Sequence, residues 1–307
     1  MGLKGRALAS GKEFYRSRIE PALRVLSLPT RQRIVFFFHQ GRLLRLAKPR
    51  TYSDLVLRRL VYDRSPELIW TCDKLAQKDH VSSMATTTRV IPTLWSGASV
   101  DELLAADLPE HWVLKRNDSS GWVYFGSGRL PVSSVEDIRR GAAANTTPFE
   151  RNGEWAYSQA RPLLLVEPHI GELGASLVDY KVFVFSGRAV MIQGHSGRSG
   201  DHRMSHFDRT WQPMPVRTSR PRCDDLPAPT RLAEMLSDAE TIAAGFDFLR
   251  VDFYEVDGVL YFGETTAYPA GGLRRFRPYA FELWLGRRWM EGVHYRPDLH
   301  RSATPTP

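Results

Sequence analysis

The sequence predicts an α+β protein made of two domains or one large composite domain, and three observations support this. Its 307 residues exceed the roughly 150 residues typical of one domain. A helical apolar pattern occurs early, at Tyr52–Tyr62, whereas short apolar runs dominate from Leu163 onward. The pairs Ser186-Gly187 and Asp257-Gly258 each separate two such runs, which is typical of β-hairpins. Helix-rich and strand-rich segments are therefore largely separate along the chain.

Each predicted element follows from a local pattern. Apolar residues at helical spacing predict helices at 52–62, 101–106, 135–141, 232–244 and 280–290, and Gly245 is a plausible C-cap for the fourth. Short runs of apolar, aromatic and β-branched residues predict strands at 112–114, 122–125, 163–166, 180–185, 188–192, 248–256 and 259–262. The polar stretch 193–209 reads as an irregular functional loop, and the proline-rich stretch 213–229 as a surface linker.

Composition excludes several classes of protein. Apolar residues make up 42% and charged residues 25%, which rules out a disordered chain, a collagen or a disulfide scaffold. The longest early apolar run, Ile34–Phe38, is far shorter than the roughly 20 residues of a bilayer-spanning helix. Charges such as Lys12 interrupt the N-terminus, unlike in a signal peptide. With only Cys72 and Cys223, a reducing cytoplasm is the expected compartment.

Positive charge concentrates in residues 1–50. This segment holds twelve Lys or Arg residues against Glu13 and Glu20, a net charge of +10, whereas the other 257 residues sum to −2. Apolar residues lie among the charges at loosely helical spacing: Leu3, Ala7, Leu8, Phe14, Tyr15, Ile19 and Leu23. A basic helical arm is therefore expected. Either it contacts an anionic membrane at its inner face or an acidic glycan, or it packs on the body as a solvated helix; nucleic acid is not an expected partner.

The last predicted hairpin carries charged side chains, and the length of its turn decides which of them lie on the same face of the sheet. Residues two apart on a strand share a face, so Arg250 and Asp252 point the same way. A two-residue turn of Asp257-Gly258 would pair Glu264 with Val251 and direct the Glu264 carboxylate away from Asp252. The turn length therefore decides whether the two carboxylates meet.

We expect a three-residue loop starting at Val256, which places Phe262 opposite Asp252. Glu264 then lies opposite Arg250, and all three charged groups share one face. Two carboxylates there suit Mg²⁺ that bridges phosphate oxygens. The alternative is an exposed hairpin with a cross-strand Arg–Glu pair.

Two further segments have a pattern suited to a nucleotide. Lys115 ends a predicted strand and precedes the small polar loop Asn117–Gly121, which suits phosphate contacts; the alternative is a polar β-turn. The apolar run Leu164–Val166 precedes Glu167 and Glu172. The backbone of such a strand could form hydrogen bonds with a purine, and the carboxylate that follows could bind the purine amino group or the ribose. The alternative is an ordinary buried strand.

Six segments in order resemble the ATP-grasp superfamily, and more narrowly the TupA-like ATP-grasp family associated with bacterial cell-surface polymer synthesis. These segments are Asp73-Lys74, Val113–Gly121, Leu165–Glu167, Asp179–Phe183, Leu249–Tyr254 and Tyr261–Glu264. Lys48–Asp54 and Asp63–Pro66 also resemble the N-terminal part of that family. The resemblance covers roughly residues 45–290 and implies two α+β lobes that clamp ATP, preceded by the basic arm.

The resemblance also implies roles for individual residues. Lys74 and Lys115 would contact the phosphates, and Lys181 would face phosphate or carboxylate. Glu167 and Glu172 would lie at the adenine–ribose end. The loop residues that would close over the phosphates are Asn117, Ser119, Ser120 and Gly121.

The catalytic and metal roles fall mainly on the hairpin. Arg250, together with Lys115, would stabilise the transferring phosphoryl group, and Asp252 and Glu264 would hold Mg²⁺. Many ATP-grasp enzymes have Asn two residues after the metal-binding Glu, whereas this chain has Thr266. Its hydroxyl can still ligate the metal or hold a coordinated water, so the departure puts a second metal in doubt more than activity.

The resemblance implies the domain boundaries as well. The basic arm would occupy residues 1–47 and an N-terminal subdomain residues 48–110. The small lobe with its loop would occupy 111–165, the large lobe with its metal site 166–295, and a tail 296–307.

The implied reaction is carboxylate–amine ligation with ATP and Mg²⁺, in which an acyl phosphate forms and an amine displaces phosphate. The substrates would be a small or polymer-linked carboxylate and an amine, used in cell-surface polymer or natural-product synthesis. The alternatives are an ATP-grasp phosphotransferase acting on a hydroxyl and a decayed nucleotide fold that binds a polyanion. Candidate acceptor contacts, which can equally be solvated loop residues, are His195, His202, His206, Arg198, Arg203, Arg274 and Arg275.

Overall fold

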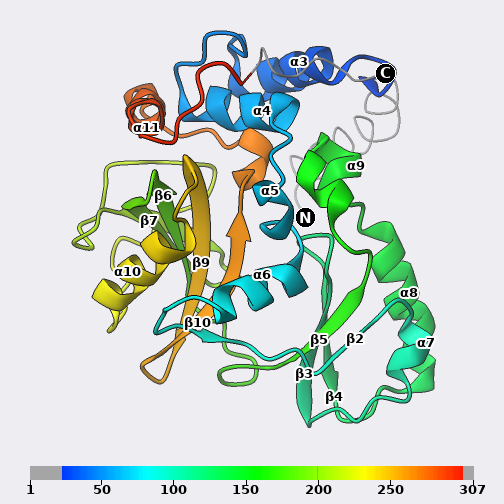
Figure 1. The fold of residues 1–307 in the computed structure, drawn as a ribbon. Helices are drawn as coiled ribbons and strands as arrows, with labels where there is room; N and C mark the ends of the chain where they lie inside the picture. Colours follow the sequence, from blue (N-terminus) through cyan, green and yellow to red (C-terminus); the bar gives the residue numbers. More distant parts are fainter. Residues whose placement is uncertain (1–22, 199, 300–307) are drawn as a thin grey trace, which may run out of the picture.

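A computed structural model describes residues 23–198 and 200–299 of the chain (Figure 1). Its strands are β1 (Arg89–Val90), β2 (Trp95–Gly97), β3 (His111–Arg116), β4 (Val123–Ser127), β5 (Leu164–Pro168), β6 (Asp179–Phe185), β7 (Arg188–Ser196), β8 (Arg203–Phe207), β9 (Phe248–Val256) and β10 (Val259–Thr266). They form a 6-stranded sheet in the order β1-β10-β9-β6-β7-β8 and a 4-stranded sheet in the order β2-β5-β3-β4. We call the parts built on these sheets the large lobe and the small lobe.

The described helices are α3 (Leu28–Gln40), α4 (Tyr52–Tyr62), α5 (Glu67–Trp70), α6 (Lys74–Ser82), α7 (Val100–Leu103), α8 (Val135–Ala144), α9 (Pro148–Asn152), α10 (Leu232–Ile242) and α11 (Tyr279–Met290), with 3-10 turns η2 (Val132–Ser134), η3 (Trp155–Gln159) and η4 (Pro269–Gly272). Figure 1 shows α10 against the large sheet and α7 and α8 beside the small one, with α5 and α6 between the lobes. None of these helices has the length and apolar character that crossing a bilayer requires.

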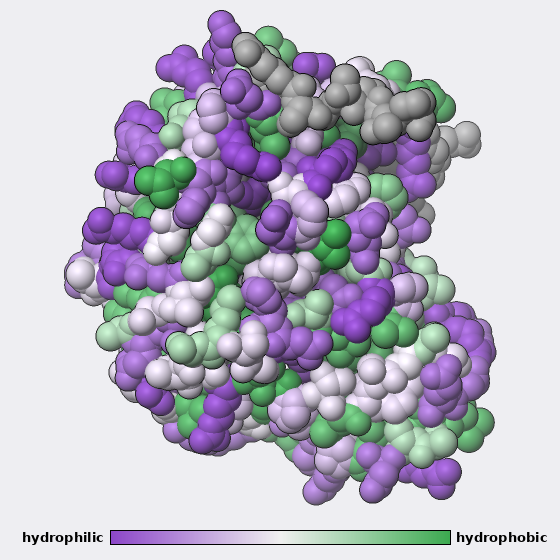
Figure 2. All heavy atoms as spheres, viewed as in Figure 1, coloured by the Kyte–Doolittle hydropathy of each residue, from purple (hydrophilic) through white to green (hydrophobic). Residues whose placement is uncertain are grey.

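Each lobe has its own apolar core. In the small lobe, Trp112 and Leu114 of β3 pack with Val166 of β5 and with Ile138 of α8. In the large lobe, Phe183 and Phe248 pack around Tyr52 of α4 and Trp289 of α11. On the face in Figure 2, hydrophilic and hydrophobic residues are interspersed. Burial of separate cores explains why the chain divides into two lobes.

Helix α4 begins and ends at the predicted residues because strong local signals mark both ends. Thr51 and Asp54 form a capping box, in which each side chain accepts from the backbone N–H of the other residue. At the C-terminus Asp63 is extended. The buried Glu282 of α11 accepts from the backbone N–H (3.2 Å) and hydroxyl (3.0 Å) of Ser53, which fixes α11 to the start of α4.

Replacing Glu282 should change how stability depends on pH. Burial raises the pKa of the Glu282 carboxyl to about 7, although Ser53 donates two hydrogen bonds to it. The folded state therefore retains a proton that the unfolded chain releases, and stability falls as pH rises from about 4.5 to 7. At pH 8, Glu282→Gln should raise the free energy of unfolding by about 1–3 kcal/mol. Urea unfolding at pH 5 and pH 8 measures this, with exposed Glu291→Gln as control; an unchanged pH dependence contradicts it.

One expectation about the chain's organisation was wrong. Residues 193–209 are not an irregular loop, because β7 continues to Ser196 and β8 pairs with it. Within residues 48–110, β1 pairs with β10 of the large sheet and β2 pairs with β5 of the small sheet, and the domain boundaries stay a prediction. Strands of two or three residues leave too little pattern to reveal such pairings. Of the predicted arm, residues 1–47, the first 22 residues lie outside the described part of the chain.

Candidate functional site

The hairpin of β9 and β10 brings the predicted charges together, but not by the predicted loop. Its turn has two residues, Asp257 (φ 51°) and Gly258 (φ 72°), both in the left-handed region that a type I′ turn requires. A β-bulge at Gly263 then shifts the register, so that Glu264 lies opposite Asp252. A Cβ at Gly263 would lie 3.0 Å from the Asp252 carbonyl oxygen. The bulge thus places both carboxylates on one face.

Asp252 is buried and held by two cations. Arg250 donates to its Oδ1 (2.6 Å) and Oδ2 (2.8 Å), and Lys181 of β6 donates to Oδ2. Arg250 also reaches the hydroxyl of Thr266 at 2.9 Å and lies 3.5 Å from Glu264. Burial alone would lower the pKa of Arg250, but Asp252 and Glu264 outweigh it and raise that pKa. The guanidinium therefore remains charged at the centre of the cluster.

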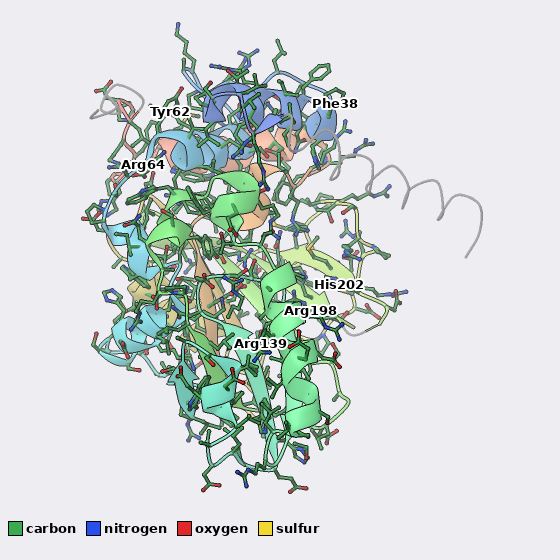
Figure 3. The ribbon with its side chains drawn as sticks, turned by 90° about the vertical axis from the view of Figure 1, so that its right-hand side faces the viewer. Phe38, Tyr62, Arg64, Arg139, Arg198 and His202 are labelled. Carbon is green, nitrogen blue, oxygen red and sulfur yellow. The ribbon has the colours of Figure 1, made fainter. Side chains whose placement is uncertain are left out.

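Lys181 forms an ion pair with a second carboxylate, which was not among the predicted site residues. Its ammonium lies 2.8 and 2.9 Å from the two carboxylate oxygens of Asp179, which is fully buried. Arg198, in the β7–β8 connection (Figure 3), also donates to Asp179. The alternation of β6 places Asp179 and Lys181 on one face, so this residue could have been found from its spacing to Lys181.

In the small lobe, Lys115 shares Glu167 with a second lysine. Antiparallel pairing of β3 and β5 places Lys115 and Glu167 on one sheet face, and Lys115 donates to the Glu167 carboxylate. Lys78 of α6 lies 2.5 Å from the other oxygen. Burial alone would raise the pKa of Glu167, but Lys115 and Lys78 outweigh it and lower that pKa. Glu167 is thus the counter-ion of two lysines, and its role at the adenine–ribose end stays a prediction.

Lys74 is the first residue of α6 and forms a hydrogen bond to the predicted phosphate loop. Asp73 caps this helix by accepting from the Ala76 N–H at 2.9 Å, and Lys74 donates to the Ser119 carbonyl oxygen. Asn117 accepts from the Leu75 N–H at 2.8 Å. These bonds fix α6 and the loop as one unit beside β3.

The side chains of the predicted loop differ in what they can contact. The Asn117 amide is engaged on both sides, since it also donates to the Arg161 carbonyl at 2.9 Å. Ser119 is buried and accepts from the Asn145 amide at 2.8 Å. Ser120 is partly exposed and Gly121 (φ 89°) is exposed. Any loop contact to phosphate therefore falls to Ser120 and Gly121 and to the backbone, whereas Asn117 and Ser119 shape the loop.

A hydrogen bond between α6 and β10 holds the helix of Lys74 against the large sheet. The Thr265 N–H donates to the Gln77 side chain of α6 at 2.9 Å. Gln77 lies one turn from Lys74, and Thr265 is next to Glu264. Burial lowers the pKa of the Lys74 ammonium, and among the charges that act on it Glu264 has the largest effect, in the opposite direction. Lys74 and Glu264 therefore lie close enough to interact electrostatically.

The donor chemistry at the hairpin fits a hard divalent cation. Asp252, Glu264 and Thr266 lie on one face, and carboxylate and hydroxyl oxygens are ligands that Mg²⁺ accepts, with phosphates and water completing the octahedron. Within the described ranges, no three His, Cys, Asp or Glu side chains group as a complete metal site. The chain alone thus offers two carboxylates, and the remaining ligands would come from a nucleotide.

Glu172 is a predicted site residue that no described side-chain contact connects to this cluster. It is exposed in the connection between β5 and β6. Lys78 was missed, although Lys74 and Lys78 are four apart on α6 and such residues share a helix face. The arrangement as a whole provides cations from both lobes and two neighbouring carboxylates, Asp252 and Glu264, on the hairpin, which suits a polyphosphate with a metal ion.

The family model TupA-like ATPgrasp matches residues 54–290. Among solved structures, a D-alanine–D-alanine ligase from Helicobacter pylori is 12% identical, with 78% of this chain and 60% of that chain covered and a TM-score of 0.41. The D-cycloserine synthetase DcsG is 14% identical, with coverage of 77% and 72% and a TM-score of 0.41.

The ATP-grasp ligase PsnB, solved with a minimal precursor, is 11% identical, with coverage of 66% and 55% and a TM-score of 0.36. The chain thus spans 55% and 60% of the first two structures found. No curated protein matches the sequence. The family match covers most of the chain. This protein therefore belongs to the TupA-like ATPgrasp family.

Proposed function

We propose that this protein is an ATP- and Mg²⁺-dependent carboxylate–amine ligase. A substrate carboxylate oxygen attacks the γ-phosphorus of ATP, so that an acyl phosphate forms and ADP leaves. An amine then attacks the acyl carbon, phosphate leaves, and loss of a proton from nitrogen gives the amide. Family membership and ligases among the similar folds support this class of reaction.

The observation that carries the proposal is the meeting of two charged clusters at the lobe boundary. Lys115 comes from the small lobe and Lys74 from α6 between the lobes, whereas Arg250 and Glu264 come from the large lobe. The bond of Gln77 to Thr265 holds α6 on the large sheet, and the bonds of α6 to Asn117 and Ser119 hold it on the small lobe. Such chemistry needs positioning and charge neutralisation rather than a nucleophilic side chain.

Each charged residue has a proposed task. Lys74 and Lys115 bind phosphate oxygens, and Arg250 stabilises the transferred phosphoryl group. Asp252 and Glu264 would hold Mg²⁺, with the hydroxyl of Thr266 as ligand or water holder; the metal supplies charge neutralisation between the phosphates. Lys181 supports this site by holding Asp252.

The remaining nucleotide contacts are proposals of the same kind. Ser120 and Gly121 would cover the phosphates, with Asn117 and Ser119 shaping their loop. Glu167 and Glu172 would lie toward adenine and ribose.

Release of ADP tests the proposal. Full-length protein with Mg²⁺ and ATP is mixed with amino acids and uronic acids, in pairs of acid and amine, and product masses are measured. We expect ADP release only when both substrates are present, with a product lighter by one water than the sum of the two. A phosphoester product would indicate transfer to a hydroxyl instead, and no ADP release would contradict an enzymatic role.

Use in cell-surface polymer synthesis, with residues 1–50 on an anionic membrane at its inner face or on an acidic glycan, is also a proposal. In the described part of this segment, the side chains of Phe38 and Leu43 are 78% and 76% exposed, and Phe38 lies on α3 (Figure 3). Exposed apolar residues among cations suit an anionic lipid surface. Sedimentation of the full chain with phosphatidylglycerol vesicles, compared with phosphatidylcholine vesicles, measures this contact.

A further inference from the structure

Arg274 is a partly buried cation that lacks a carboxylate partner among the described residues. Its guanidinium contacts the Met204 sulfur at 3.5 Å, and a thioether is a weak acceptor. Burial and the neighbouring Arg250 lower the pKa of Arg274. By contrast, Arg250 and Lys181 on the same side of the large sheet each hold a carboxylate. The positive charge of Arg274 is therefore uncompensated.

The chain fixes the backbone of Arg274 in place. The Gln40 side chain donates to the carbonyl oxygens of Leu273 and Arg274, both at 3.1 Å. Three residues later, Arg277 and Arg217 exchange two backbone hydrogen bonds of 2.8 Å. The guanidinium thus projects from an anchored segment rather than from a freely moving loop.

Two buried imidazoles close to Arg274 also have an unused nitrogen. His195 Nδ1 pairs with His202 Nε2 at 2.9 Å, and His206 Nε2 pairs with the Gln193 amide at 2.9 Å. Nε2 of His195 and Nδ1 of His206 have no hydrogen-bond partner among the described residues. Arg274 acts electrostatically on both rings, and burial together with such cations lowers the pKa of His195 and brings that of His206 to about 3.

These groups lie on the face of the large sheet that carries the hairpin charges. Across the strands, Lys181 pairs with Gln193, and Gln193 pairs with His206. His195 pairs with Met204, the residue that Arg274 contacts. A partly buried charge without a counter-ion and buried polar atoms without a hydrogen bond each cost free energy, so their proximity beside the proposed phosphoryl-transfer site points to a ligand that satisfies them.

We propose that Arg274, assisted by His195 and His206, binds a second anionic group of the acid substrate, apart from the carboxylate that is activated. This inference rests on the proposed function, because it specifies the substrate of the same site. A carboxylate or phosphate accepts two N–H bonds from a guanidinium, and a neutral imidazole N–H can donate a third. The preferred substrate is therefore an acid with at least two negative charges.

Binding without turnover tests the subsite directly. Calorimetric titrations use the dicarboxylates malonate, succinate, glutarate and adipate, with inorganic phosphate as a second anion and the monoamide of glutarate as the singly charged match. Arg274→Met removes the cation, and Arg277→Met, at an exposed arginine three residues further on, is the matched control. We expect a dianion to bind wild type and Arg277→Met equally, and Arg274→Met at least about tenfold more weakly.

Thermal unfolding separates binding from structure. Because Arg274 is partly buried without a counter-ion, Arg274→Met should keep or raise the unfolding midpoint while it weakens binding; a lowered midpoint would indicate a structural role and overturn the proposal. Equal binding by Arg274→Met and wild type, or no binding of any dianion to wild type, would also overturn it. Phosphate binding that Lys115→Met abolishes and Arg274→Met leaves unchanged would place that anion at the nucleotide phosphates, against the subsite.

The ADP-release assay distinguishes failure of the subsite from failure of the proposed function. The acid substrate is glutamate or glutamine in one pair of assays, and aspartate or asparagine in the other. If the subsite exists, wild type prefers the member of each pair that has two carboxylates. Arg274→Met should lose this preference because its KM for the acid rises, whereas its KM for ATP stays unchanged. ADP release without that preference would contradict the proposed subsite and leave the proposed ligase activity supported. Dianion binding that depends on Arg274, without ADP release from any acid, would contradict the ligase activity and leave the subsite supported.

Discussion

Glu264→Gln should lower ATP-dependent ADP release about 100-fold or more while the fold persists. The Glu264 side chain is 33% exposed and its described ionic partner, Arg250, lies 3.5 Å away, so loss of its charge leaves no closely paired group behind. It is nevertheless one of the two carboxylates proposed for Mg²⁺, and the metal stabilises the charge that develops on transferring phosphates. Initial rates over a range of Mg²⁺ concentrations measure the loss.

A control on the same hairpin separates a local role from general charge. Glu255 lies at the other end of β9 and accepts from the Thr230 N–H at 2.9 Å. Glu255→Gln removes the same charge and should retain the wild-type rate. Undiminished ADP release by Glu264→Gln, or equal losses in both variants, would contradict the assignment of Glu264 to the metal.

Lys181→Met should lower the free energy of unfolding by about 3–5 kcal/mol, the usual effect of removing one partner from a buried ion pair. The ammonium contacts Asp179 and Asp252, whose side chains are 0% and 1% exposed. Arg198 and Arg250 would remain, but two buried carboxylates would lose the cation that they share. Urea unfolding at pH 7 gives this value, with the exposed Lys48→Met as a control that should change little.

A double variant shows whether the effect comes from unpaired charge. Asp179→Asn combined with Lys181→Met removes one carboxylate together with the ammonium, so it should recover part of the lost stability. If the double variant loses the sum of the two single effects, the residues do not act as a pair, and the electrostatic explanation is wrong.

The sequence predicted which charges meet on the hairpin but not how they meet. Alternation along β9 places Arg250 and Asp252 on one side whatever the turn. The turn signal of Asp257-Gly258 favours two residues, and the structure has that turn. A bulge at Gly263 returns Glu264 to the sheet face that carries Asp252. A single glycine in a strand gives only a weak indication of such a bulge.

Long-range contacts account for most of what the sequence did not reveal. Residues 193–209 look like a loop because Gln193, His195 and His206 are polar residues at buried positions on one face of the sheet, so the strands lack the usual alternation. The bond between Gln77 and Thr265 joins residues 188 positions apart, and no local pattern indicates it. By contrast, α4 carries its capping box within four residues, so its bounds could be predicted.

Calorimetry of ATP binding tests most directly the claim that both lobes hold one nucleotide. The account predicts one ATP per chain, bound in the presence of Mg²⁺ and much more weakly in its absence. Lys115→Met in the small lobe and Glu264→Gln in the large lobe should each weaken binding at least about tenfold. Absence of binding to wild type, or binding that one of these variants leaves unchanged, would contradict the claim.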